Sequence, residues 1–188
     1  MNTLFPDYSV YPEGFIYHPD FITQQEESEL LKEIEKLNLH TFIFQGYSAK
    51  RKVASFGFDW NFETRTLSKG VEIPSVFTPL IKRVASFIQK DESTIAELLV
   101  TEYPIDSVIN WHRDAPPFDI IAGISLLSDC RFKLKPHEKA KQTKASTITI
   151  PVKRRSIYVL KGEARENWQH SISPVKERRV SITVRTLK

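Results

Sequence analysis

Two residues of this sequence, His112 and Asp114, have the types and the spacing of metal ligands. They stand two positions apart, and on an extended strand residues two apart point to the same side of the chain. An imidazole nitrogen and a carboxylate oxygen can therefore converge on one ion. A His-x-Asp pair is short enough to occur by chance, and a lone histidine is more often a core or surface residue. The pair therefore needs a third ligand before it predicts a metal site.

The third ligand that we predict is His170, 58 residues after His112. His137 is the alternative, but it stands in a lysine-rich stretch where an exposed position is more typical. Two histidines and one carboxylate leave coordination positions open, as non-haem Fe(II) oxygenases require for a bidentate cosubstrate and O₂. A closed four-ligand zinc site has no such positions, and a chain whose single cysteine is Cys130 has no cysteine-rich zinc site.

A strand near the C-terminal end presents two arginines on one face. Apolar and polar residues alternate from Arg179 to Arg185, so both arginines share a face with Ser181 and Thr183. Such arginines either reach solvent or pair with anions. An edge strand with its polar face in water is the simpler interpretation of this strand alone. Beside the predicted ligands, a dicarboxylate cosubstrate that binds both guanidinium groups is favoured. At ~3.3 Å per residue the two Cα atoms are roughly 20 Å apart, so the side chains must lean together.

The composition is that of a single globular domain. The chain has 188 residues, 40% of them hydrophobic and 27% charged, which is enough for a sizeable core. No apolar run approaches the ~20 residues that span a bilayer, and the first residues do not resemble a signal peptide. With one cysteine, we expect a cytoplasmic monomer that has no membrane partner. The net charge of +4 permits a nucleic-acid partner, but charge alone favours an ordinary solvated surface.

The N-terminal part predicts two amphipathic helices. The first runs from Gln24 to Leu37, with Thr23 as its cap and Glu26 completing a capping box. The second runs from Pro79 to Lys90, with Thr78 as its cap. Apolar residues recur at helical spacing in both, which most simply indicates core packing.

Short strands separated by turn signals are predicted for the rest of the chain. Residues 42–66 predict strands with loops, and seven more strands are predicted downstream at Glu97–Tyr103, Val108–His112, Ile120–Leu127, Arg131–Leu134, Ser146–Val152, Ser156–Leu160 and Arg179–Leu187. Many short strands are typical of a closed or double-sheet β architecture such as a jelly roll. We interpret the lysine-rich stretch from Lys135 to Lys144 as a solvated hairpin loop.

The region from about Leu98 to Leu187 resembles the catalytic core of the AlkB family of Fe(II)- and 2-oxoglutarate-dependent dioxygenases. Members of this family carry Asn-x-Tyr, His-x-Asp, a distant His and a C-terminal Arg-x-Asn/Ser-x-Thr-x-Arg motif, which is the most specific piece. The matching residues are Thr101-Glu102-Tyr103, His112-Arg113-Asp114, His170 and Arg179-Val180-Ser181-Ile182-Thr183-Val184-Arg185. More loosely, the stretch from Phe56 to Phe62 resembles the family's variable nucleotide-recognition lid.

The resemblance implies an α+β, mainly β fold: a double-stranded β-helix (jelly roll) with N-terminal helices packed on one face. It implies a single dioxygenase domain over residues 1–188, with helices and a substrate-recognition lid in 1–96 and the catalytic core in 97–188. The implied cofactors are Fe(II), 2-oxoglutarate as cosubstrate and O₂. The implied catalytic metal ligands are His112, Asp114 and His170.

The resemblance also implies roles in binding 2-oxoglutarate. Tyr103 and Arg179 would hold its distal carboxylate, with Ser181 nearby. Arg185 would lie toward the oxalyl end and help to position it. Thr101 stands where the family usually has Asn.

The chemistry implied is oxidative dealkylation of N-alkylated bases in DNA or RNA, acting on a single strand or a flipped base. Pro116 stands where one branch of the family has an acid that helps to read the base, which leaves the substrate open. A protein or small-molecule substrate is the alternative, and a non-enzymatic β-domain is disfavoured by the complete ligand set. The substrate-binding residues that we predict, from basic and aromatic character, are Lys50, Arg51, Phe56, Phe58, Trp60 and Trp111.

Overall fold

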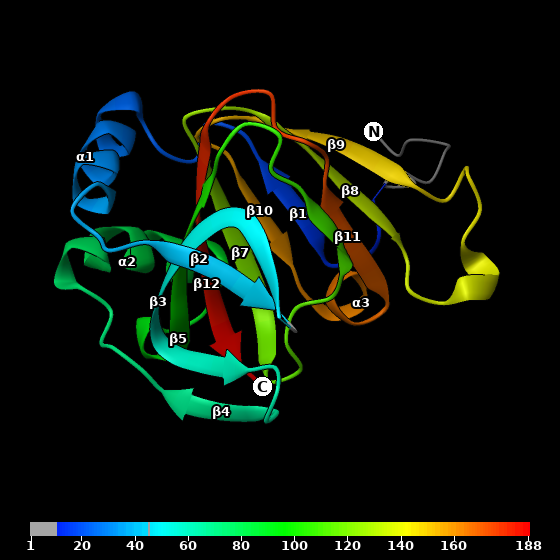
Figure 1. Cartoon of the computed structure of the whole chain (residues 1–188), viewed down its shortest axis with the longest axis horizontal. Coiled ribbons are helices and arrows are strands. Elements are labelled where there is room, and N and C mark those ends of the chain that lie inside the picture. Colours follow the sequence, from blue (N-terminus) through cyan, green and yellow to red (C-terminus); the bar gives the residue numbers. More distant parts are fainter. Residues whose placement is uncertain (1–10, 45) are drawn as a thin grey trace, which may run out of the picture.

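The computed structural model describes residues 11–44 and 46–188 and consists mainly of two antiparallel sheets (Figure 1). The larger sheet has the strand order β1-β10-β7-β12-β5-β3-β2, with β4 paired to β3. Its strands are β1 (Phe15–His18), β2 (His40–Phe44), β3 (Tyr47–Asn61), β4 (Thr66–Lys69), β5 (Ile95–Tyr103), β7 (Phe118–Leu126), β10 (Ile157–Leu160) and β12 (Arg179–Leu187). The smaller sheet has the order β6-β11-β8-β9. Its strands are β6 (Ile109–His112), β8 (Cys130–Pro136), β9 (Ile148–Val152) and β11 (Trp168–Ile172).

Two helices cover the face of the larger sheet that points away from the smaller one. Figure 1 shows α1 (Gln24–Ile34) and α2 (Thr78–Phe87) on one side, the smaller sheet on the other, and β5 and β12 between them. Apolar residues of both helices join those of the sheet in one core cluster, which includes Ile34, Val84, Leu98 and Ile182. A short helix, α3 (Gly162–Glu166), and three 3-10 turns (Ser75–Phe77, Glu92–Thr94 and Lys139–Lys141) complete the elements. This is the predicted jelly-roll fold.

The alternation of β12 divides the interior into two layers. Val180, Ile182 and Val184 pack in the helix-side core. The intervening polar residues face the space between the sheets and are nonetheless buried, with Arg179 fully inaccessible to solvent. The interpretation of this strand as a solvated edge is therefore wrong, because β12 is paired on both sides, with β5 and β7. Burial of an arginine row at the centre of a sheet indicates a binding site.

Most predicted elements are present, with shifted ends. Thr23 and Glu26 form the predicted capping box of α1. The second helix differs: it begins at Thr78, its N-cap is Phe77, and no side chain caps it. Three short strands, β1, β4 and β11, lie outside the predicted ones except for Thr66, because four or five residues with mixed polarity give no clear period of two. None of the helices in the described ranges is long and apolar enough to cross a membrane.

Candidate active site

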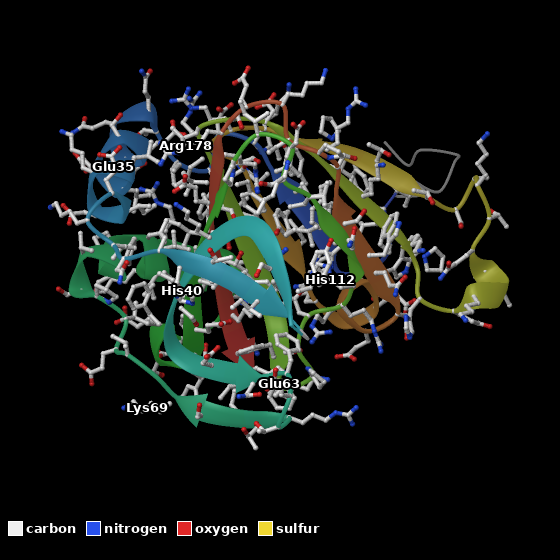
Figure 2. The ribbon with its side chains drawn as sticks, in the orientation of Figure 1. Glu35, His40, Glu63, Lys69, His112 and Arg178 are labelled. Atoms are coloured by element: carbon white, nitrogen blue, oxygen red, sulfur yellow. The ribbon has the colours of Figure 1, made fainter. Side chains whose placement is uncertain are left out.

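The pairing of β6 with β11 brings the three predicted ligands together. His112 and His170 are direct cross-strand partners, and their ring centroids are 4.2 Å apart. Asp114 follows β6, and its Oδ2 lies 3.4 Å from Nε2 of His170. Each of the three offers a ligand atom within 4.8 Å of the others. Two histidines and one carboxylate at these distances could hold an Fe(II) ion. His112 is labelled in Figure 2, where it lies at the end of β6.

The two imidazoles are held in orientations suited to a metal. Nδ1 of His112 lies 2.8 Å from the backbone carbonyl of Asn110, to which its N–H donates, so Nε2 is left with a free lone pair. The ring of His170 stacks on Phe132, with centroids 5.4 Å apart. Burial, together with the nearby His112, lowers the pKa of His170 to about 3. His170 is therefore neutral at physiological pH, which is the form that binds a metal.

The carboxylate of Asp114 uses its two oxygens differently. Its Oδ1 accepts hydrogen bonds from Nε and Nη2 of Arg185, at 3.1 and 2.7 Å. Its Oδ2 is buried and has no hydrogen-bond partner among the described residues. Burial alone would raise the pKa of Asp114, but Arg185 and the two histidines outweigh it and hold the pKa below its usual value. A charged, buried oxygen without a partner among the described residues, beside two imidazoles, fits the donor set of a metal ion.

Arg165 of α3 fixes the loop that carries Asp114. Its Nη2 donates to the backbone carbonyls of Asp114, Ala115 and Phe118, at 3.2, 2.8 and 2.9 Å. Arg165 is buried, and these bonds connect α3 to the chain between β6 and β7. The position of the carboxylate ligand therefore depends on a residue about 50 positions away in the sequence.

Arg179 shows where an anion would bind. The side chain is fully buried, and its Nε donates to Oγ of Ser125 at 2.9 Å. Both terminal nitrogens, Nη1 and Nη2, have no partner among the described residues. The guanidinium carbon lies 4.8 Å from the ring centre of Tyr103. Burial of a cation with two unused donors is costly unless a ligand supplies an anion, and a carboxylate matches the two-pronged geometry.

The other predicted cosubstrate residues lie on the same face as Arg179. The Tyr103 hydroxyl is 3.3 Å from Oγ of Ser181, and Thr101 is the cross-strand partner of Ser181. Sequence reasoning missed Tyr158, whose ring lies against Gly123 so closely that any side chain at position 123 would clash with it. The glycine therefore gives the phenol room to lie between the sheets.

Arg185 pairs with two acids of the protein, Asp114 and Glu97. Its role toward the oxalyl end of 2-oxoglutarate stays a prediction. Glu97 is buried, and it also accepts a hydrogen bond from Ser55 at 3.2 Å. Although burial acts to lower the pKa of Arg185, the two carboxylates raise it above its ordinary value. Glu97 was missed, although the alternation of its strand places it on the same face as Tyr103.

Replacing Glu97 with glutamine is expected to weaken metal binding by about 10- to 100-fold, the effect typical of residues that orient a ligand. The amide can still accept a hydrogen bond from Arg185, but the second negative charge is lost and Arg185 is held less firmly against Asp114. Anaerobic Fe(II) titration measures the effect. Glu102→Gln is the matched control, since Glu102 lies on the same strand and its partner Arg178 is half exposed. Equal Fe(II) affinity in the Glu97 variant and the wild type would contradict this role.

The predicted aromatic substrate residues of β3 lie in different surroundings. Phe56 is wrong as a substrate residue: it contacts Phe77, with ring centroids 6.5 Å apart, and packs against the helix-side core. Trp60 packs against the core cluster between the sheets. Phe58 is half-buried on β3, opposite Lys69 of β4. The aromatics of this segment therefore serve largely as core.

The predicted cations of the rim, and Trp111, also differ in their surroundings. Lys50 is exposed. Arg51 is partly buried, with its guanidinium 4.1 Å from the ring centre of Phe42, and burial lowers its pKa. Trp111 lies under Lys135, 4.6 Å from its Nζ, and its neighbour His112 points to the opposite side of β6. Trp111 is therefore on the outer face of the smaller sheet.

A cleft of about 360 Å³ adjoins the metal ligands on the Asp114 side. His137, the alternative third ligand, lines this cleft and is not part of the ligand cluster. Pro116 lines it as well. The other lining residues are Phe62, Arg113, Asp114, Ala115, Arg165, Glu166, Gln169 and Lys188. Figure 2 shows Glu63, the neighbour of Phe62, at the turn between β3 and β4.

Comparison with known proteins agrees with a site for Fe(II) and 2-oxoglutarate. The family model of the 2OG-Fe(II) oxygenase superfamily matches residues 14–185. The chain is 27% identical over 208 residues to the "Alkylated DNA repair protein ALKBH8 homolog" of Arabidopsis thaliana, covering 93% of this chain and 58% of that protein. It is 25% identical over 171 residues to the "tRNA (carboxymethyluridine(34)-5-O)-methyltransferase ALKBH8" of Mus musculus. This match covers 88% of this chain and 25% of that protein. The chain thus spans less than two thirds of the length of either relative.

A solved structure shows the same fold. "The structure of OsALKBH1" superposes with a TM-score of 0.74 at 14% identity, over 95% of this chain and 99% of that one. Residue by residue, the chain offers the ligand types that Fe(II) requires and an unpaired buried guanidinium suited to 2-oxoglutarate. The chain belongs to the 2OG-Fe(II) oxygenase superfamily, and the relatives and the solved structure to which it is similar carry the names of AlkB homologues.

Proposed function

We propose that this dioxygenase oxidatively removes alkyl groups from bases of nucleic acid, DNA or RNA. The observation that carries the proposal is the cleft beside Asp114, which is lined by Arg113, Arg165 and Lys188. Glu166 lines the cleft as well and pairs with Lys188 at 2.8 Å, so Arg113 and Arg165 are the cations left to meet a substrate that brings phosphate groups to the site. The printed names of two relatives, one a DNA repair protein and one a tRNA-modifying enzyme, support the same substrate class.

Within the proposed site, each group has a defined task. His112, Asp114 and His170 would hold the metal, while Arg179, Tyr103 and their neighbours would bind the cosubstrate. Fe(II), 2-oxoglutarate and O₂ supply the oxidising chemistry when bound. The protein orients these groups and excludes water, because apolar residues of both sheets, such as Phe132 of the smaller sheet and Ile121 of the larger one, surround them.

The buried Arg165 supports a role of the cleft in binding anions. Its Nη2 is fully used by backbone carbonyls, but its Nε is buried and has no partner among the described residues. Arg113 is exposed beside it and donates to the backbone carbonyl of Glu166 at 2.7 Å. A phosphate in the cleft would bring negative charge close to both guanidinium groups.

We propose the same division of the chain as the sequence predicts: helices and lid in 1–96, catalytic core in 97–188, and one domain acting as a monomer. The metal ligands and the Arg179 pocket are complete within one chain, which supports a monomer. The lid would include the β3–β4 hairpin, whose residue Phe62 lines the cleft. β1, β2 and β3 also extend the larger sheet, so the first part contributes to the core as well. Lys50 and Arg51 stay predicted contacts for the phosphate backbone.

Succinate release tests the proposed function. We expect methylated single-stranded DNA or RNA to stimulate Fe(II)-dependent succinate release above the level without substrate, and formaldehyde to appear in equal amount. The unmethylated oligonucleotide of the same sequence is the control. Stimulation by a methylated peptide or a small molecule, with none by nucleic acid, would contradict the proposal and favour the alternative substrate class.

A further inference from the structure

The outer face of the smaller sheet carries a row of cations. On β8, the buried residues Cys130, Phe132 and Leu134 alternate with Arg131, Lys133 and Lys135, which face outward. Residues two apart on a strand are about 6.6 Å apart, so the three cations form a straight, evenly spaced row. We call it the β8 row.

No acid lies beside the β8 row on the neighbouring strands. On β9, Pro151 and Thr149 are the cross-strand partners of Arg131 and Lys133. On β11, the partners of Lys133 and Lys135 are uncharged as well, Ser171 and Gln169. Among the residues that the structure describes, no ion pair involves any of the three cations. A surface that serves only for solubility usually mixes both signs of charge.

The charge of the chain is concentrated around this row. Residues 130–144 contain six Lys or Arg and a single acid, Glu138, a net charge of +5. The whole chain has a net charge of +4, so the other residues together are slightly negative. Figure 1 shows the loop between β8 and β9, which carries three of these lysines, projecting from the molecule. A strongly basic segment in a chain whose other residues are slightly negative indicates a polyanionic partner.

The β8 row leads to the cleft beside the metal ligands. His137, the next outward position after Lys135, lines the cleft together with Arg113 and Gln169. Lys135 also lies over the ring of Trp111. The cations and the aromatic ring of this outer face therefore end beside His137 and Gln169, two residues that line the cleft.

We propose that this face binds the phosphate backbone of a single nucleic-acid strand, on the nucleotides that flank the base in the cleft. A linear row of cations matches a linear polyanion, and neighbouring aromatic or guanidinium groups can stack an unpaired base. The proposal rests on the proposed function and names the surface that the substrate uses. It also gives a role to the lysine-rich stretch from Lys135 to Lys144, which the sequence alone predicts to be a solvated hairpin loop.

The test is charge reversal with a matched control. Arg131→Glu with Lys133→Glu removes two cations of the β8 row. Lys82→Glu with Lys90→Glu makes the same change in net charge on and just after α2, where both residues are exposed. Binding of labelled single-stranded DNA and RNA is measured by fluorescence anisotropy from low to moderate salt. The slope of log affinity against log salt is expected to fall by about 1.4 in the β8 variant, since each lost phosphate contact contributes roughly 0.7 for single strands. The control should keep the wild-type slope, and melting temperatures check that both variants fold.

Equal slopes in the β8 variant and the wild type would overturn this inference. Anionic lipid vesicles are the second probe: binding to vesicles that requires Arg131 and Lys133, without binding to oligonucleotide, would also overturn it. Succinate release from the wild type with methylated oligonucleotide is measured in parallel. If that turnover is present while the slopes are equal, the proposed function stands and the surface is wrong. If the turnover is absent, the proposed function itself fails.

Discussion

Replacing Asp114 with alanine is expected to weaken Fe(II) binding by more than about 100-fold and to abolish 2-oxoglutarate turnover. Loss of a residue that merely orients a ligand typically costs 10- to 100-fold in metal affinity, and Asp114 is itself the only carboxylate of the ligand cluster. The variant should still fold, because Arg185 keeps its second partner, Glu97, and is not left as an unpaired buried charge.

Anaerobic Fe(II) titration followed by succinate assay measures this effect. Asp106→Asn is the control, since Asp106 is exposed and has a φ of 65°, a conformation that asparagine tolerates. Unchanged Fe(II) affinity in the Asp114 variant would place the metal elsewhere in the molecule.

Replacing Arg179 with alanine is expected to weaken 2-oxoglutarate binding by about 2–4 kcal/mol, because the carboxylate would lose its charged partner in a buried site. That corresponds to roughly 30- to 700-fold in dissociation constant. Removal of this guanidinium leaves no acid of the described residues without its partner, since the Arg179 side chain donates its hydrogen bond to the hydroxyl of Ser125. The 2-oxoglutarate affinity of the Arg179→Lys variant should lie between those of the wild type and the alanine variant, because lysine keeps the charge and loses the two-pronged geometry.

Arg178→Ala is a strict control for this prediction. It removes the same residue type one position earlier, where the side chain is half exposed and pairs with Glu102 at 3.2 Å. We expect its 2-oxoglutarate affinity and its Fe(II) affinity to match the wild type. Calorimetric titration with 2-oxoglutarate measures the dissociation constant of the Arg179→Ala variant. A value equal to that of the wild type would show that Arg179 is not part of the cosubstrate site.

The residues that sequence could predict are those whose spacing is local. His112 and Asp114 point the same way because they are two apart beside one strand, and Arg179 shares a face with Ser181 for the same reason. His170 was predicted without such a local signal, since only the pairing of β11 with β6 brings it near the other two ligands. The N-terminal capping box was equally local and was predicted correctly.

What sequence could not predict depends on long-range register. Glu97 reaches Arg185 only because β5 and β12 pair in one particular register. Phe56 has the same composition signal as a stacking residue, yet the register of β3 against β5 turns it to the helix side, opposite Leu98. A shift of one residue would have exchanged the two faces, and composition contains no information about that choice.

The Arg185 arrangement has a consequence for the order in which metal and cosubstrate associate. Two buried carboxylates, Asp114 and Glu97, and two buried guanidinium groups, Arg179 and Arg185, cancel in formal charge, while His170 is neutral. These four groups therefore balance one another in formal charge before anything binds, and Arg165, which is also buried, lies outside this set on the cleft side of Asp114. A divalent cation alone would leave two excess positive charges in a low-dielectric space, and 2-oxoglutarate alone would leave two excess negative ones, both unfavourable. Fe(II) and 2-oxoglutarate are thus counter-ions of each other, and the affinity for each is expected to rise when the other is present.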